Sequence, residues 1–152
     1  MTRQLEEFVS INKDEVRMYT CGPTVYNYAH IGNFRAYIFE DLLRRVIKLN
    51  GYKMIQTMNL TDVDDKTIRD SQVAGMSLDD FTAQYKKAFF ADLEKLNIEK
   101  AEFYPAATDH IDDMIKMIEI LIEKEFAYVA DDNCVYYSIN KFEHYGCLAK
   151  ID

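Results

Sequence analysis

Hydrophobic and polar positions follow two different periods in the first half of the chain. Residues 16–21 alternate and end at Gly22-Pro23, which predicts a strand followed by a turn. Residues 34–49 carry apolar side chains at helical spacing, and Asn50-Gly51 is typical of a helix end. Residues 54–58 predict a second strand, so the segment is expected to be a βαβ unit with parallel strands and a right-handed crossover. The inward helix positions are expected to be Phe34, Tyr37, Ile38, Leu42, Val46 and Leu49.

The second half keeps the helical period almost to its end. Ser77 is placed to cap one helix, and Thr108-Asp109 to open another, both with acidic outer faces that we interpret as solvated surface. Residues 127–130 and 135–139, separated by a polar turn, predict a hairpin. The inward positions are expected to be Leu78, Phe81, Tyr85, Phe89, Leu93 and Leu96 in the first helix, and Ile111, Met114, Ile115, Ile118, Leu121 and Ile122 in the second.

Composition narrows the class of protein without naming a function. A chain of 152 residues can bury one core of useful size. Its net charge of −8, with the acidic excess in the second half, excludes a strongly basic nucleic-acid footprint, so RNA contacts would need local patches or a longer chain. No run is long and apolar enough to span a bilayer, and the first residues resemble no targeting signal, so we expect a cytoplasmic protein without membrane contact. Three cysteines without a CxxC pair favour reduced thiols.

The segment His30-Ile31-Gly32-Asn33 stands where the first helix begins. Backbone N–H groups and the positive dipole end at a helix start favour anions such as phosphates. Gly32 allows close approach of a ligand, and His30 and Asn33 can donate hydrogen bonds to a phosphoryl oxygen. Alone, this motif fits a structural role at least as well as a functional one. Cys21, at the end of the first strand, is by itself also more typical of a small buried residue.

Several blocks together resemble a known family. Residues 21–26 read CGPTVY, residues 30–33 read HIGN and residues 59–66 read NLTDVDDK, and the similarity continues through YPAATDHI at 104–111 and YGCL at 145–148. This series resembles the cysteinyl-tRNA synthetases, in which HIGN is a form of the class I His-Ile-Gly-His signature. The resemblance covers nearly the whole chain from Arg17 onward.

The resemblance implies a fold class and an activity. The fold would be α/β, with residues 1–75 as the first half of a Rossmann-like catalytic domain and residues 76–152 as a mostly helical connective insertion with a hairpin. The activity would be cysteine–tRNA ligation: ATP with Mg²⁺ activates L-cysteine as cysteinyl adenylate, and the cysteinyl group passes to tRNA(Cys). The full-length form is expected to be a monomer with one Zn²⁺.

The resemblance also assigns roles to particular residues. His30 and Asn33 would be catalytic, Cys21, Gly22 and Thr61 would lie at the substrate, and Cys21 would be one of four zinc ligands, the others lying beyond residue 152. Cys134 and Cys147 fall on the predicted hairpin and a late loop, away from this site. The nucleotide-binding region would comprise Pro23, Thr24, Val25, Tyr26, Asn27, Tyr28, Ala29, His30, Ile31, Gly32 and Asn33.

Some residues near these motifs keep two interpretations. For Asp64 and Asp65 we favour capping of a helix that starts near Lys66, while a divalent-ion site that also includes Asp62 stays open. Tyr26 and Tyr28 would pack either on a nucleotide or on the core.

The second class I signature, Lys-Met-Ser-Lys-Ser, does not occur in this sequence. Residues 1–152 alone are therefore expected to be inactive. Two rival hypotheses are a cysteine ligase of the mycothiol-pathway type, which tends to have Pro where Val25 stands, and a non-catalytic module that binds a nucleotide, a tRNA end or a protein.

Overall fold

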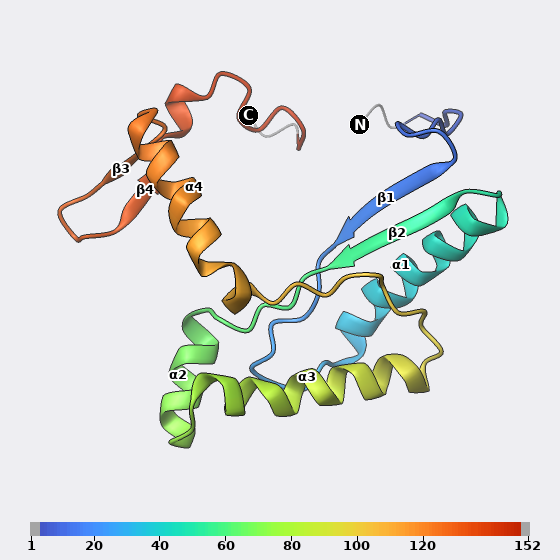
Figure 1. The fold of residues 1–152 in the computed structure, drawn as a ribbon, viewed down its shortest axis with the longest axis horizontal. Helices are drawn as coiled ribbons and strands as arrows, with labels where there is room; N and C mark the ends of the chain where they lie inside the picture. The colour runs from blue at the N-terminus through green and yellow to red at the C-terminus, as the bar shows by residue number, and fades with distance from the viewer. Residues whose placement is uncertain (1–3, 150–152) are drawn as a thin grey trace. The chain divides into compact units, whose positions relative to one another are not determined.

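Two parallel strands joined by a helix form the centre of the unit Val9–Asp109, the larger of two compact units in the computed structural model, which describes residues 4–149. Strand β1 (Glu15–Thr20) pairs with β2 (Lys53–Met58), with Val16 opposite Met54 and Thr20 opposite Met58. Helix α1 (Ile31–Leu49) connects them and lies alongside β2 (Figure 1). The predicted βαβ unit is confirmed.

A third extended segment lies beside β2, although the sequence pattern did not predict it. The N–H of Met58 donates to the carbonyl of Phe103 at 3.0 Å, and the N–H of Leu60 donates to that of Pro105 at 2.8 Å. Parallel bridges join Thr57 to Phe103 and Leu60 to Ala106. This segment therefore pairs with the free edge of β2 and extends the small sheet.

Two further helices of this unit begin at the caps that the sequence predicts. Asp64 caps α2 (Asp65–Ala74), accepting hydrogen bonds from the N–H groups of Lys66 and Thr67. Ser77 caps α3 (Leu78–Lys95) by accepting from the N–H of Asp80. The capping role preferred for Asp64 is thus confirmed, and Asp65 lies in the first turn of the same helix.

The hydrophobic core lies between α1, α3 and the end of β2. Tyr37 contacts Phe34 and Phe89 edge-on, with ring centroids 5.9 and 5.4 Å apart. The inward positions predicted for α1 were only partly right, because Ile38, Leu42, Val46 and Leu49 are exposed in the described structure while Arg44 is buried. In α3, Phe81, Phe89 and Leu93 are buried as predicted, whereas Leu96 is exposed. The core cluster comprises Phe34, Tyr37, Met58, Leu60, Phe89, Leu93, Ile98 and Ala101.

Arg44 is buried because two glutamates surround its guanidinium group. Glu102 binds it through both carboxylate oxygens at 2.8 and 2.6 Å, and Glu99 accepts from its Nε at 3.0 Å. The Arg44 hydrogen bond holds the pKa of Glu102 down to about 2, against the opposing effect of burial. Glu102 also accepts the backbone N–H of Gln56 at 2.6 Å, so the ion pair fixes the extended segment to β2.

Asp62 is fully buried just after β2 and joins three parts of the unit. One carboxylate oxygen accepts the backbone N–H of Thr108 at 2.9 Å. The other accepts the Thr108 hydroxyl at 2.7 Å and Lys86 Nζ, from α3, at 2.5 Å. Burial raises the pKa of Asp62, but these hydrogen bonds outweigh it and leave that pKa below its ordinary value.

The smaller unit consists, in its described part, of residues 4–8 and 110–149. After the short helix η1 (Ala107–His110), α4 (Ile111–Glu123) precedes the antiparallel pair β3 (Ala127–Val129) and β4 (Val135–Tyr137), which confirms the predicted hairpin. The short helix η2 (Ile139–Lys141) follows. The burial predicted for α4 was wrong: none of its residues is buried in the described structure, because within this unit α4 packs mainly on the short β3.

The division at residue 75 into a catalytic half and an insertion stays a prediction, since the two compact units reflect contact density alone. Among residues 4–149, no helix has the length and apolar character needed to cross a membrane.

We expect Asp62→Ala to lower the free energy of unfolding by about 2–4 kcal/mol, because Thr108 and Lys86 lose their acceptor. Urea unfolding followed by circular dichroism measures this change. The matched control is Asp65→Ala, in the exposed first turn of α2, which should cost less than about 1 kcal/mol. Equal losses for the two variants would contradict a special role for the buried carboxylate.

Candidate active site at the start of helix α1

The first turn of α1 is closed by a reciprocal pair of hydrogen bonds. His30 is the N-cap, and its Nδ1 accepts the N–H of Gly32 at 3.0 Å. In return, Asn33 Oδ1 accepts the N–H of His30 at 3.1 Å. Each of the two side chains with predicted catalytic roles is therefore held by a backbone N–H of this turn, in the manner of a capping box.

These bonds determine which donors remain available. With Nδ1 acting as acceptor, a neutral His30 ring carries its proton on Nε2. The N–H groups of Asn33 and Phe34 bond to the carbonyl of His30. Among the described residues, nothing accepts from His30 Nε2, from Asn33 Nδ2 or from the N–H of Ile31. An anion bound at this helix start would therefore have two side-chain donors, His30 Nε2–H and Asn33 Nδ2–H, and one backbone donor, the N–H of Ile31.

A pocket of about 280 Å³ opens beside this helix start. No carboxylate lines it, and Lys66 is its one permanently charged lining residue within the described structure. Most of the predicted nucleotide-binding segment contributes, although Val25, Ile31 and Gly32 do not. The lining residues are Gly22, Pro23, Thr24, Tyr26, Asn27, Tyr28, Ala29, His30, Asn33, Tyr37 and Lys66.

One wall of the pocket is held by the residues that follow β2. The N–H of Val25 donates to the carbonyl of Thr61, and the N–H of Thr61 donates to that of Pro23, both at 3.0 Å. Gly22 lies against Asn59 so closely that an added Cβ would come within 1.8 Å of the Asn59 carbonyl oxygen. Only glycine fits at position 22, and it brings the two strand ends together.

Aromatic residues complete the pocket. Tyr28 contacts Tyr85 of α3 edge-on, with centroids 5.2 Å apart, and Tyr26 lies beneath Lys66, whose Nζ is 5.0 Å from its ring centroid. Both therefore contact protein and also face the pocket. Burial raises the pKa of Tyr37 to about 12, with further contributions from the neighbouring Cys21 and Glu40.

Cys21 and Thr61 lie near the pocket in sequence but do not line it. The Cys21 thiol is exposed, and its Sγ is 3.6 Å from the Gly22 carbonyl oxygen. Thr61 accepts a hydrogen bond from Asn59 Nδ2 at 3.0 Å. The part of the chain that the structure describes holds no group of three or more His, Cys, Asp or Glu arranged for a metal, so neither a zinc site nor the three-acid site at Asp62 is formed by these residues.

Lys66 ends the family motif at residues 59–66, and its sequence context predicts no role for it. Its place in the pocket depends on α2 beginning just after the second strand, where Asp64 fixes the first turn. A single lysine directly after Asp64-Asp65 carries no local signal of this kind. Only the fold brings it to the start of α1.

The βαβ unit and its pocket identify a class of fold. A parallel βαβ unit with a polar pocket at the start of its crossover helix is the form of a nucleotide-binding α/β fold. The agnB2 LeuRS of Agrobacterium radiobacter K84, solved in a ternary complex with tRNA and LeuAMS, matches with a TM-score of 0.64 at 19% identity over 73% of this chain and 15% of its own. The fold is therefore that of the class I synthetases.

The sequence then gives the family. Residues 7–152 match the class I (C) tRNA synthetase catalytic domain, and the chain belongs to this family. It is 57% identical over 149 residues to the cysteine–tRNA ligase of Protochlamydia amoebophila, covering 98% of this chain and 31% of that protein. The ligase of Brachyspira hyodysenteriae is 57% identical over 152 residues, covering 100% and 32%. The chain thus spans about a third of the length of the curated relatives it matches.

We expect Gly32→Ala to keep helix α1 but displace the His30 ring. An added Cβ would lie 2.8 Å from His30 Cε1 and 3.0 Å from Nδ1, so the flexible side chain must move. ¹⁵N NMR in alkaline buffer should show a ring protonated on Nε2 in the wild type and a mixture of tautomers in the variant. His144, in a loop of the other unit, is the internal control. Unchanged His30 nitrogen shifts in the variant would contradict the capping geometry.

Proposed function

We propose that this chain forms the part of a cysteine–tRNA ligase that activates cysteine with ATP. The observation that carries the proposal is the carboxylate-free pocket at the start of α1, where His30 and Asn33 keep unused hydrogen-bond donors. Family membership supports the choice of reaction. The substrates would be L-cysteine, ATP with Mg²⁺, and tRNA(Cys), and the enzyme would act as a cytoplasmic monomer.

The cysteine carboxylate is already a nucleophile, so the reaction needs no strong base. It needs the reactants to be positioned and the charge on the α-phosphate to be stabilised. The carboxylate of cysteine attacks the α-phosphorus of ATP, an oxygen–phosphorus bond forms, and the bond to the leaving pyrophosphate breaks. Negative charge grows on the non-bridging oxygens of the α-phosphate. Donors held in place before the reaction stabilise that charge without reorganising.

His30 and Asn33 suit this role because a backbone N–H holds each side chain in place, that of Gly32 for the His30 ring and that of His30 for the Asn33 amide. His30 Nδ1 and Asn33 Oδ1 are used within the capping box, which leaves His30 Nε2–H and Asn33 Nδ2–H to donate toward the phosphate oxygens. The cysteinyl adenylate then gives its cysteinyl group to the 3′ end of the tRNA. A hydroxyl oxygen at that end attacks the carbonyl carbon and forms an ester, the mixed anhydride bond to the phosphate breaks, AMP leaves with its electron pair, and the hydroxyl proton is released to solvent.

Cys21, Gly22 and Thr61 would lie at the amino-acid end of the site, at the carboxyl ends of β1 and β2. In the family zinc supplies a soft Lewis acid that selects a thiolate. Residues 4–149 provide one exposed thiol near this edge, Cys21, and one donor does not make a tetrahedral site. We therefore place Cys21 as a single zinc ligand.

A chimera tests the proposed reaction. Residues 1–152 replace the corresponding N-terminal segment of the Protochlamydia amoebophila cysteine–tRNA ligase, which is 57% identical. We expect cysteine-dependent ATP–pyrophosphate exchange, and we expect His30→Ala in the chimera to lower its rate by about 10²–10³-fold, as for loss of one preorganised donor.

The isolated 152-residue chain is the negative control and should show no exchange. Exchange that is robust in the isolated chain would contradict the expectation that these residues are inactive alone. A well-folded chimera with no exchange would instead favour a non-catalytic binding module.

The same chimera tests the zinc assignment. Cys21→Ser should lower zinc content, measured by atomic emission, together with cysteine activation, because a hydroxyl is a poor ligand for zinc. Cys134→Ser, which changes another exposed cysteine far along the chain, is the matched control and should leave both unchanged. Full zinc content in the Cys21 variant would remove Cys21 from the ligand set.

A further inference from the structure

Lys66 gives the pocket a feature that the proposed chemistry at His30 and Asn33 does not use. It is the one permanently charged residue among the described lining residues, in a chain whose net charge is −8. A fixed positive charge without a lining carboxylate favours an anion in the pocket over a neutral or cationic ligand.

Within the described residues the ammonium group of Lys66 makes no close ion pair; the pKa of Asp70 is lowered first by the Arg69 hydrogen bond and then, at longer range, by the Lys66 charge. Within residues 4–149 no carboxylate oxygen lies within 4.0 Å of Lys66 Nζ. The nearby acids are used elsewhere: Asp64 accepts backbone N–H groups of α2, and Asp70 pairs with Arg69 at 2.6 Å. By contrast, Lys86 is committed to the buried Asp62. Lys66 is thus a charge available to a ligand.

Tyr26 orients this charge. Lys66 Nζ lies 5.0 Å from the centroid of the Tyr26 ring, and the ring itself lines the pocket. A cation over an aromatic face is attracted to it without losing its hydrogen-bond donors. The backbone of Lys66 is fixed as well, since its N–H donates to Asp64 Oδ1 at 3.0 Å. Both ends of the side chain are therefore restrained along the pocket wall.

We propose that Lys66 is a phosphate-binding residue of this pocket. From α2, it would hold the polyphosphate of the nucleotide, together with His30 and Asn33 at the start of α1. This inference rests on the proposed function for the identity of the nucleotide. The interaction would be the attraction of an ammonium point charge to the negatively charged oxygens of the phosphate chain. The pocket then combines a positive group from α2 with the donors at the start of α1.

Binding of inorganic pyrophosphate and of ATP to the 152-residue chain, measured by isothermal titration calorimetry, tests the assignment. Lys66→Met keeps an unbranched apolar stem on Tyr26 and removes the charge, so it should weaken both ligands by about tenfold or more. Lys66→Arg should retain binding within a few-fold. Adenosine, which has no phosphate, should bind equally to wild type and Lys66→Met.

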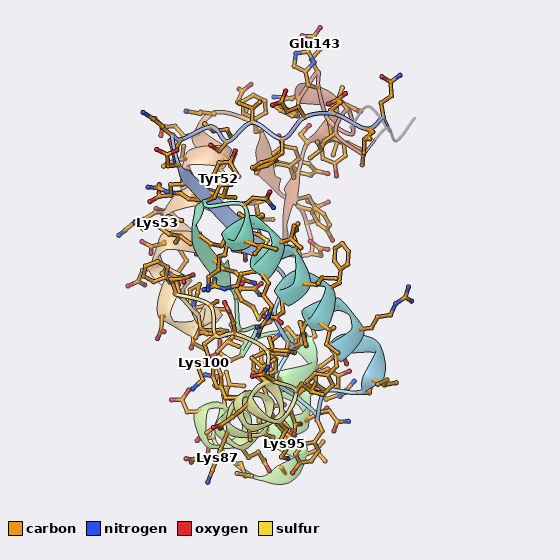
Figure 2. All side chains as sticks on the ribbon, turned by 90° about the vertical axis from the view of Figure 1, so that its right-hand side faces the viewer. Tyr52, Lys53, Lys87, Lys95, Lys100 and Glu143 are labelled. Atoms are coloured by element: carbon orange, nitrogen blue, oxygen red, sulfur yellow. The ribbon has the colours of Figure 1, made fainter. Side chains whose placement is uncertain are left out.

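Lys87 of α3 provides the matched control. Its side chain is exposed, lies outside the pocket lining and points away from the rest of the ribbon (Figure 2). Lys87→Met removes the same charge and should leave pyrophosphate and ATP affinity unchanged. Circular dichroism spectra of all variants check that the fold is retained.

The outcomes separate this inference from the proposed function. Equal pyrophosphate affinity of wild type and Lys66→Met, equal losses in the Lys66 and Lys87 variants, or no pyrophosphate binding by the wild type would each overturn the role of Lys66. If the chimera is active while Lys66→Met leaves its KM for ATP unchanged, only the inference fails. If pyrophosphate binding depends on Lys66 but the chimera shows no exchange, the anion site stands and the ligase function fails.

Discussion

The geometry of the pocket depends on a single buried carboxylate. Asp62 has no exposed surface, and its two oxygens together accept three hydrogen bonds, two from Thr108 and one from Lys86. Its neighbour Thr61 exchanges backbone hydrogen bonds with Pro23 and Val25. Because a carboxylate buried away from water must be satisfied by protein, α3 and the residue after the extended segment are held against the end of β2. Thr61 follows β2 directly before Asp62, so this anchoring also holds the pocket wall that Thr61 supports through its hydrogen bonds with Pro23 and Val25.

The elements of the larger unit could be predicted because their signals are local. The strand pattern before Gly22, the helix end at Asn50-Gly51 and the caps at Asp64 and Ser77 all act within a few residues. The edge pairing of residues 101–107 was missed because it depends on Arg44, which reaches Glu102 across 58 positions. The period of apolar residues within one segment carries no information about a pairing between residues so far apart in the sequence.

The same limit explains the errors in burial and the gap in the site. An apolar stripe on α1 or α4 shows that a helix is amphipathic, but which side chains are covered depends on the neighbours that the fold supplies. His30 and Asn33 were found because the motif is contiguous and resembles a family signature. Lys66 was not assigned, since the chain between it and Tyr26 runs through a crossover helix and a strand. Roles that arise from spatial assembly leave no trace in a short motif.

The capping bond of His30 has one more consequence. Since Nδ1 faces the N–H of Gly32, the ring can turn only its Nε2 edge outward. That edge carries the hydrogen of the neutral imidazole, because the lone pair of Nδ1 accepts the N–H of Gly32. While this cap is intact, the outward face of the ring is therefore a hydrogen-bond donor and not an acceptor. The cap of α1 therefore determines the hydrogen-bonding role of His30 Nε2 in the protein without a ligand.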